Sequence, residues 1–131
     1  MREFDQWNEI KKETQKDKII VGFKNRDIFY IKMGQNIGFE QNGKGNKFVR
    51  PVVVLKKFNR YMFFGIPLST QIKEGKFYHY FEFKKQRVTS KNIALLSQLR
   101  LYSSNRLLNK IGVINQNDFD IIKNKIKTLI E

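Results

Sequence analysis

The chain has 131 residues, 40% of them hydrophobic and 14% aromatic, so it is long enough to build the core of one domain. Its 26 lysine and arginine residues against 12 acidic ones give a formal charge of +14. That excess favours a polyanionic partner such as RNA, DNA or an acidic protein over a merely solubilising surface. The absence of cysteine excludes disulfides, thiolate nucleophiles and cysteine-based metal sites.

The first segment carries Phe4, Trp7 and Ile10 at three-residue spacing, which predicts a short amphipathic helix reaching about Thr14. We expect residues 1–25 to form a helical extension with a first strand, and residues 26–131 to form the main domain. No stretch has the apolar length of a signal peptide or of a membrane span. These observations predict a cytoplasmic protein with no membrane partner.

From Ile19 onward the sequence is a series of short apolar runs separated by Gly, Asn and Lys clusters, which is typical of β-strands. The runs are "IIVGF", "DIFYIKM", "VRPVVVL", "YMFFGIPL", "FYHYFEF", "IALLSQLRLY" and "KIGVI". The period then changes: Phe119, Ile122, Ile126 and Leu129 predict a C-terminal helix, with a capping pair at positions 115 and 118. Many short strands followed by one helix predict a small, strongly curved sheet or barrel with the helix against one side.

The glycine-rich stretch from Gly38 to Lys44 almost matches a nucleotide-binding P-loop, but Gly45 stands where a Ser or Thr must reach magnesium. The stretch also leads into a strand rather than a helix, and it lacks the third glycine of a dinucleotide fingerprint. His79 is the only histidine, on the strand face of Phe77 and Phe81, where a packed or surface role is commoner than metal ligation. We therefore predict no metal and no cofactor.

Four pieces in fixed order resemble the MazF/PemK toxin family, to which Kid and, distantly, CcdB belong. They are "DIFYIKMGQNIGFEQ", "RPVVVL", "IPLST" and "LLSQLRLYSSNRLLNKIGVI", followed by an amphipathic helix. The resemblance implies a mainly β fold with a C-terminal helix: a small SH3-like β-barrel of the MazF/PemK/CcdB type, here with an extra N-terminal helix. It also implies a homodimer, cleavage of single-stranded RNA without a metal ion, and a small acidic antitoxin as partner.

The resemblance assigns the catalytic arginine of the family to Arg50, whose planar guanidinium can grip two phosphate oxygens. Ser69 stands where relatives carry a catalytic threonine, and Thr70 would exchange with it if the alignment slipped by one residue. Arg100, with Gln98, matches a Gln-x-Arg stretch and would add a second catalytic cation. Each of these residues, taken alone, has an ordinary structural explanation; their combination predicts a site.

The remaining predicted residues bind substrate. Glu40 and Gln41 occupy the family's Gly-x-Glu-Gln position, and Lys44 and Lys47 lie in a loop longer than the usual version. We interpret this loop as a flexible cationic lid over an RNA groove, with Arg50 at its hinge. Phe39, Phe48 and Tyr78 could stack on bases or fill the barrel.

The sequence also departs from the family pattern, because Ser103 stands where some relatives have an aspartate beyond the arginine. That departure and Ser69 leave a second function open, a catalytically inactive module that binds RNA or an acidic partner. A third possibility, gyrase poisoning as in CcdB, fits poorly because the chain end "KNKIKTLIE" does not match those relatives. The leading hypothesis is a toxin endoribonuclease that forms a 2′,3′-cyclic phosphate.

Overall fold

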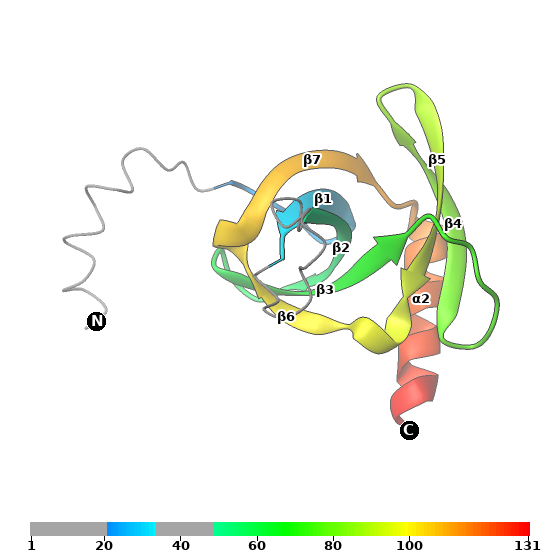
Figure 1. Ribbon diagram of the computed structural model, residues 1–131. Helices are drawn as coiled ribbons and strands as arrows, with labels where there is room; N and C mark the ends of the chain where they lie inside the picture. Colours follow the sequence, from blue (N-terminus) through cyan, green and yellow to red (C-terminus); the bar gives the residue numbers. More distant parts are fainter. Residues whose placement is uncertain (1–20, 34–48) are drawn as a thin grey trace, which may run out of the picture.

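The computed structural model describes residues 21–33 and 49–131, which form one curled antiparallel sheet with a helix against it (Figure 1). The strands are β1 (Asp27–Lys32), β2 (Val49–Lys57), β3 (Met62–Ser69), β4 (Tyr78–Lys85), β5 (Val88–Leu95), β6 (Arg100–Ser103) and β7 (Leu107–Val113). Two short 3-10 helices, η3 (Leu96–Gln98) and η4 (Ser104–Arg106), flank β6, and α2 (Gln116–Ile130) follows β7. The predicted N-terminal helix lies outside the described residues.

The strands pair in the order β4-β5-β3-β2-β1-β7, and β6 pairs with β3 beside β5. Strands β1, β2, β3, β6 and β7 curl around one another, while the β4–β5 hairpin stands at the side next to α2 (Figure 1). The predicted mainly β, barrel-like fold with a C-terminal helix is therefore confirmed.

The alternation of side-chain direction along each strand divides the hydrophobic core into two clusters. In β2, Val53 packs with the helix-side cluster, whereas Val52 and Val54 pack with the cluster enclosed by the curled strands. Successive strand residues point to opposite faces, so one strand serves both clusters. The enclosed cluster holds Phe63 stacked on Tyr102, with ring centroids 5.5 Å apart.

Helix α2 begins as the sequence predicts. The side chain of Asn115 accepts a hydrogen bond from the backbone nitrogen of Asp118 at 2.7 Å, which satisfies a donor that the first helical turn leaves free. The apolar stripe of Phe119, Ile122 and Ile126 is buried against the sheet. Leu129 packs at its edge.

Two of the predicted strands differ from the structure by more than a shift of their ends. In "IIVGF", Val21–Phe23 is described and is not a strand; Phe23 instead packs its ring on Phe63, with centroids 5.1 Å apart. The run "IALLSQLRLY" is interrupted by η3, so that β5 ends at Leu95 and β6 begins at Arg100. Within the described residues, no helix is long and apolar enough to span a membrane.

Candidate active site

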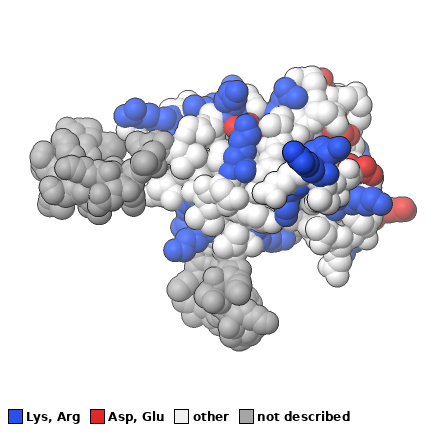
Figure 2. Space-filling model, turned by 90° about the horizontal axis from the view of Figure 1, so that it is seen from above, with Lys and Arg blue, Asp and Glu red and all other residues white. Residues whose placement is uncertain are grey.

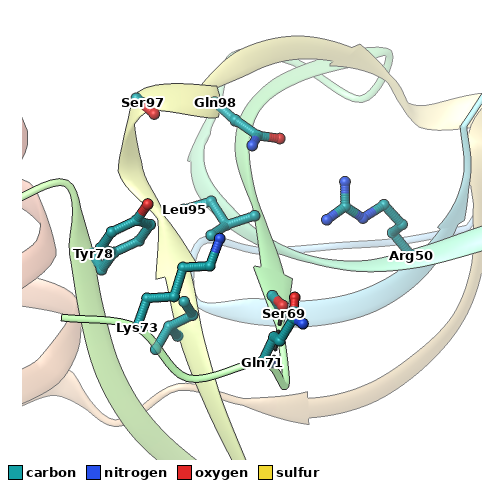
Figure 3. A pocket seen from close by; sticks show the side chains of 9 residues that line it. Arg50, Ser69, Gln71, Lys73, Tyr78, Leu95, Ser97 and Gln98 are labelled. Atoms are coloured by element: carbon teal, nitrogen blue, oxygen red, sulfur yellow. Dashed lines mark hydrogen bonds between the residues drawn. The ribbon is translucent and has the colours of Figure 1, made fainter.

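A cleft of about 240 Å³ opens where the start of β2, the end of β3, the start of β4, the end of β5 and η3 meet (Figure 3). These segments are brought together because β5 and β6, on either side of η3, both pair with β3. The cleft is lined by Arg50, Ser69, Gln71, Lys73, Tyr78, Ile93, Leu95, Ser97 and Gln98. Its walls combine cations, hydroxyls and amides with one aromatic ring over an aliphatic floor.

Arg50 is the second residue of β2 and pairs with Ile31 of β1. Its side chain is half-buried and reaches toward the open space of the cleft (Figure 3). Because Arg50 is two residues from Val52, it shares the strand face that packs into the enclosed cluster. A rigid central strand therefore presents the guanidinium, rather than a free loop.

Ser69 is the last residue of β3, and its hydroxyl oxygen accepts a hydrogen bond from the backbone nitrogen of Gln71 at 3.0 Å. A hydroxyl has one hydrogen to donate in addition to its acceptor positions. With the oxygen held by Gln71, that hydrogen can point to a ligand oxygen in the cleft. Thr70 is exposed and does not line the cleft, so the structure favours Ser69 of the two.

Lys73 lies in the connection between β3 and β4 and is exposed. Its amino group points into the cleft from the side opposite Arg50, and the amide of Gln98 points into the same space from η3 (Figure 3). Two cations facing each other across a cleft lined with hydroxyls form an anion-binding arrangement. This arrangement suits a phosphodiester.

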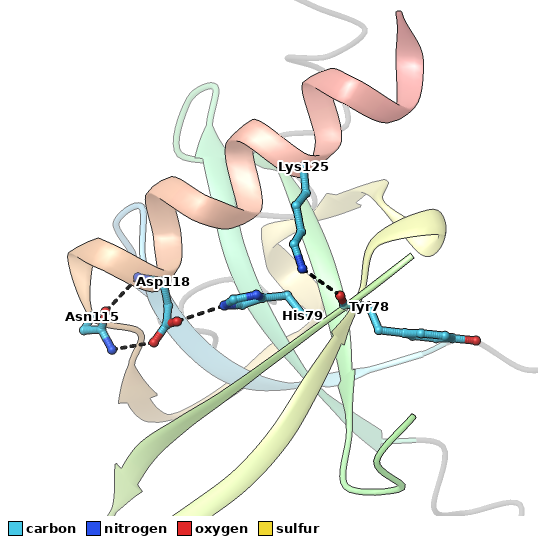
Figure 4. Close-up of polar contacts among 5 residues, drawn as sticks. All are labelled: Tyr78, His79, Asn115, Asp118 and Lys125. Carbon is cyan, nitrogen blue, oxygen red and sulfur yellow. Dashed lines mark hydrogen bonds and ion pairs between the residues drawn. The ribbon is translucent and has the colours of Figure 1, made fainter. Parts of the chain in front are cut away.

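Tyr78, the first residue of β4, forms one wall of the cleft, and helix α2 supports this strand end from behind (Figure 4). The amino group of Lys125 donates to the carbonyl oxygen of Tyr78 at 3.2 Å. The next residue, His79, places Nε2 2.8 Å from Oδ1 of Asp118. The predicted face of His79 is confirmed, because its ring stacks on buried Phe81 at 6.4 Å.

Arg100 lies beside the cleft rather than in its lining. Its guanidinium carbon is 5.2 Å from the centre of the Tyr102 ring, a cation–π contact. Burial raises the pKa of the Tyr102 hydroxyl, and the positive charges of Arg100 and Arg50 act in the opposite direction. Both arginines are therefore near this hydroxyl.

Comparison with known proteins shows the family and the fold of the chain. Residues 24–130 match the PemK-like, MazF-like toxins of type II toxin-antitoxin systems. The chain belongs to this toxin family. Its fold is similar to that of the Mycobacterium tuberculosis toxin MazF-mt6, with a TM-score of 0.59, 11% sequence identity, and coverage of 80% of this chain and 96% of that one. No curated protein matches the sequence significantly.

In this PemK-like, MazF-like toxin, the sequence predicted part of the cleft lining. Of the predicted residues, Arg50, Ser69 and Gln98 line it, whereas Thr70 and Arg100 do not. Glu40, Gln41, Lys44 and Lys47, which form the predicted lid, lie outside the described residues. The hydroxyl of Ser103, at the position that departs from the family pattern, donates to Oδ1 of Asn105 at 2.9 Å.

Sequence reasoning missed Gln71, Lys73 and Ser97 altogether. Their nearness in sequence to predicted residues was the one signal that could have found them. Gln71 and Lys73 closely follow Ser69, and Ser97 directly precedes Gln98. Among the described residues, no group of three or more His, Asp or Glu side chains is placed to hold a metal ion.

Proposed function

We propose that this toxin is an endoribonuclease that cleaves single-stranded RNA without a metal ion. The observation that carries the proposal is the placement of Arg50, Lys73 and the Ser69 hydroxyl around one cleft. Cations on both sides of a phosphodiester, together with hydrogen-bond donors, favour its cleavage. The reason is that the transition state carries more charge on the phosphate oxygens than the ground state does. Family membership supports the assignment, and the net charge of +14 suits a polyanionic substrate.

The reaction begins with attack of a ribose 2′-oxygen on the adjacent phosphorus. The new bond joins the 2′-oxygen to phosphorus, and the bond from phosphorus to the 5′-oxygen breaks. The products are a 2′,3′-cyclic phosphate and a 5′-hydroxyl; one proton leaves the 2′-hydroxyl and one is supplied to the 5′-oxygen. The protein must therefore hold the phosphate in line and stabilise the charge on its oxygens.

Arg50 and Lys73 are the residues that hold the phosphate in this scheme, and Ser69 donates to one of its oxygens. Gln98 contributes a neutral donor or acceptor that can read a base or a ribose. Tyr78 offers a ring on which a base can stack. The part of the cleft that the structure describes contains no carboxylate. Glu40 is therefore our candidate to accept the proton of the 2′-hydroxyl.

The toxin would work in the cytoplasm as a homodimer, with an acidic antitoxin occupying the cleft. An acidic tail and an RNA strand present the same charge to Arg50 and Lys73, so they would compete for one surface. The alternative is an inactive member of the same family that binds RNA or a partner through this cleft. Ser103, which is already bonded to Asn105, favours that alternative because it offers no carboxylate.

The experiment is cleavage of a long, weakly structured RNA by purified protein in the presence of EDTA, with fragment ends mapped by primer extension. Wild type should give discrete cuts that leave cyclic phosphate, and Arg50→Ala should give none while it still folds. Arg60→Ala, in the exposed turn before β3 and outside the cleft lining, is the matched control and should cut normally. Normal cutting by Arg50→Ala would refute the site, and salt-sensitive binding without cuts by wild type would favour the inactive module.

A further inference from the structure

The outer face of the β4–β5 hairpin continues the wall of the cleft. Tyr78 pairs with Leu95 and Tyr80 pairs with Ile93, and three of these four residues line the cleft. Directly paired residues of an antiparallel ladder point to the same side, and so does every second residue along each strand. The same face therefore carries the next pairs, Glu82 with Lys91 and Lys84 with Thr89.

Beyond the cleft, where Ile93 and Leu95 are buried, the outer face is exposed. Tyr80, Glu82, Lys84, Thr89 and Lys91 are all exposed. On the inner face, Phe81 and Phe83 are buried in the cluster under α2. At about 3.4 Å of rise per residue, the exposed face extends roughly 20 Å from Tyr78 to Lys84, away from the cleft.

The hairpin is strongly basic. Between Tyr78 and Leu95 it carries four cations, Lys84, Lys85, Arg87 and Lys91, against the single carboxylate of Glu82. Figure 2 views the molecule from above, and lysine and arginine side chains are spread over this face, with several acidic side chains toward the right of the view. The one carboxylate keeps its charge opposite Lys91, and its Oε2 accepts a hydrogen bond from the Tyr80 hydroxyl at 2.6 Å.

The hairpin is also held in place before any ligand arrives. Its turn residues Gln86 and Arg87 have φ of 56° and 77°, the positive values that a tight two-residue hairpin turn requires. The amino group of Lys85 donates to the Tyr30 hydroxyl of β1 at 2.8 Å and lies over that ring. A hairpin backbone fixed in this way loses little conformational entropy on binding.

We propose that this face, defined by Tyr80, Lys84 and Lys91, is a track that binds the single-stranded RNA leaving the cleft. Lys84 and Lys91 would contact phosphates, and Tyr80 would stack on a base. Tyr80 lies nearer the cleft and both lysines lie beyond it toward the turn. An aromatic side chain next to cations is a general arrangement for binding a single strand without sequence preference. The inference rests on the proposed function, because it extends the same substrate beyond the cleavage site.

The test compares short (about 6 nucleotides) and long (about 16 nucleotides) mixed-sequence 2′-O-methyl RNAs, a size range that brackets single-strand binding sites. These RNAs have no 2′-hydroxyl nucleophile, so their binding is measured by fluorescence anisotropy whether or not the protein cleaves. Wild type should bind the long RNA about tenfold more tightly, with a steeper salt dependence. The variant Lys84→Glu with Lys91→Glu should bind the short RNA within about twofold of wild type and lose most of the gain from length.

The control is Lys123→Glu with Lys127→Glu, which makes the same change of net charge at exposed positions on α2. Helix α2 covers the inner face of the hairpin, so this control leaves the track intact. Tyr80→Ala should reduce long-RNA binding by several-fold, and Tyr80→Phe should not, because the ring and not the hydroxyl stacks.

Equal losses in the track variant and in the α2 control would overturn the proposal, since they would show only a net-charge effect. An unchanged length dependence in the track variant would also overturn it. So would a track variant that no longer binds an acidic peptide but still binds RNA as wild type does. Failure of the proposed function would look different: wild type would leave ordinary long RNA uncut while the length-dependent binding to the 2′-O-methyl RNA, and its loss in the track variant, remained.

Discussion

His79 Nε2 lies 2.8 Å from Oδ1 of Asp118, and this contact ties the start of β4 to the first turn of α2 (Figure 4). The other carboxylate oxygen of Asp118 accepts a hydrogen bond from the side-chain nitrogen of Asn115 at 2.7 Å. His79 follows Tyr78 directly, so the contact fixes the strand end that forms one wall of the cleft. The helix therefore supports the site without entering it.

Replacement of Asp118 by alanine should lower the free energy of unfolding by about 1–2 kcal/mol, because it leaves the half-buried ring of His79 without its partner. Denaturant titration measures the change. Asp120→Ala is the matched control, since the Asp120 side chain is exposed and, among the described residues, bonds only Gln116 in the same helix. Equal effects of the two substitutions would show that the contact between β4 and α2 contributes nothing.

Lys73→Ala should reduce kcat/KM for RNA cleavage by roughly tenfold or more, because one of two cations facing the phosphate is lost. Lys76→Ala provides the comparison: Lys76 lies in the same loop, outside the cleft lining, with its amino group 5.5 Å from the centre of the Phe77 ring. Steady-state cleavage of a fluorogenic RNA measures both. If the two variants behave alike, Lys73 acts only through the overall charge of the loop.

Ser69→Ala should lower kcat by about 10- to 100-fold, because a hydrogen-bond donor to a phosphate oxygen is removed. Ser69→Thr should retain most of the activity, since threonine keeps the hydroxyl at the end of β3. Thr70→Ala should be close to wild type, because that side chain does not line the cleft. Greater loss in Thr70→Ala than in Ser69→Ala would reverse the assignment.

Tyr102 should make the unfolding free energy fall at alkaline pH. Burial raises the pKa of its hydroxyl, so above about pH 10 the unfolded chain loses this proton while the folded chain keeps it. The stabilisation is complete below pH 10 and is lost as pH rises through the folded pKa. Tyr102→Phe should show a flatter fall above pH 10 than wild type, measured by denaturant titration at several pH values.

At neutral pH, Tyr102→Phe should be as stable as wild type or up to about 1 kcal/mol more stable. The reason is that the Tyr102 hydroxyl is buried without a hydrogen-bond partner in the described part of the chain. A clear loss of stability at neutral pH would mean that the hydroxyl makes a favourable contact after all.

Gly112→Ala should destabilise the fold by about 1–3 kcal/mol. A Cβ at this position of β7 would come within 2.4 Å of the Phe83 ring, which packs the β4–β5 hairpin onto the barrel. Gly22→Ala is the control, because no residue that the structure describes lies within 4 Å of a Cβ there. Thermal melts of the two variants should therefore differ, and similar melts would show that the hairpin can move away from β7 at little cost.

The sequence by itself determined the features that depend on neighbours along the chain. The 3.6-residue stripe and the capping pair located α2, because helix caps form between residues three apart. The alternation of side chains along a strand predicted that His79 shares a face with Phe81. The fixed order of motifs predicted Arg50, Ser69 and Gln98 as site residues. The same local signals misjudged Val21–Phe23, which is apolar because Phe23 fills the enclosed cluster and not because it is in a strand.

Only the tertiary structure decided which of these residues share a site. Arg50 and Ser69 are near each other because β2 and β3 are paired neighbours. Lys73 reaches the cleft because the β3–β4 connection passes beside it, and Tyr78 is held there by its contact with α2. Arg100 is outside the lining, and its guanidinium lies over Tyr102, because the two residues are two positions apart in β6 and share one face of the strand. Such placements depend on long-range pairing and packing, whose energies are distributed over many contacts and leave no short pattern in the sequence.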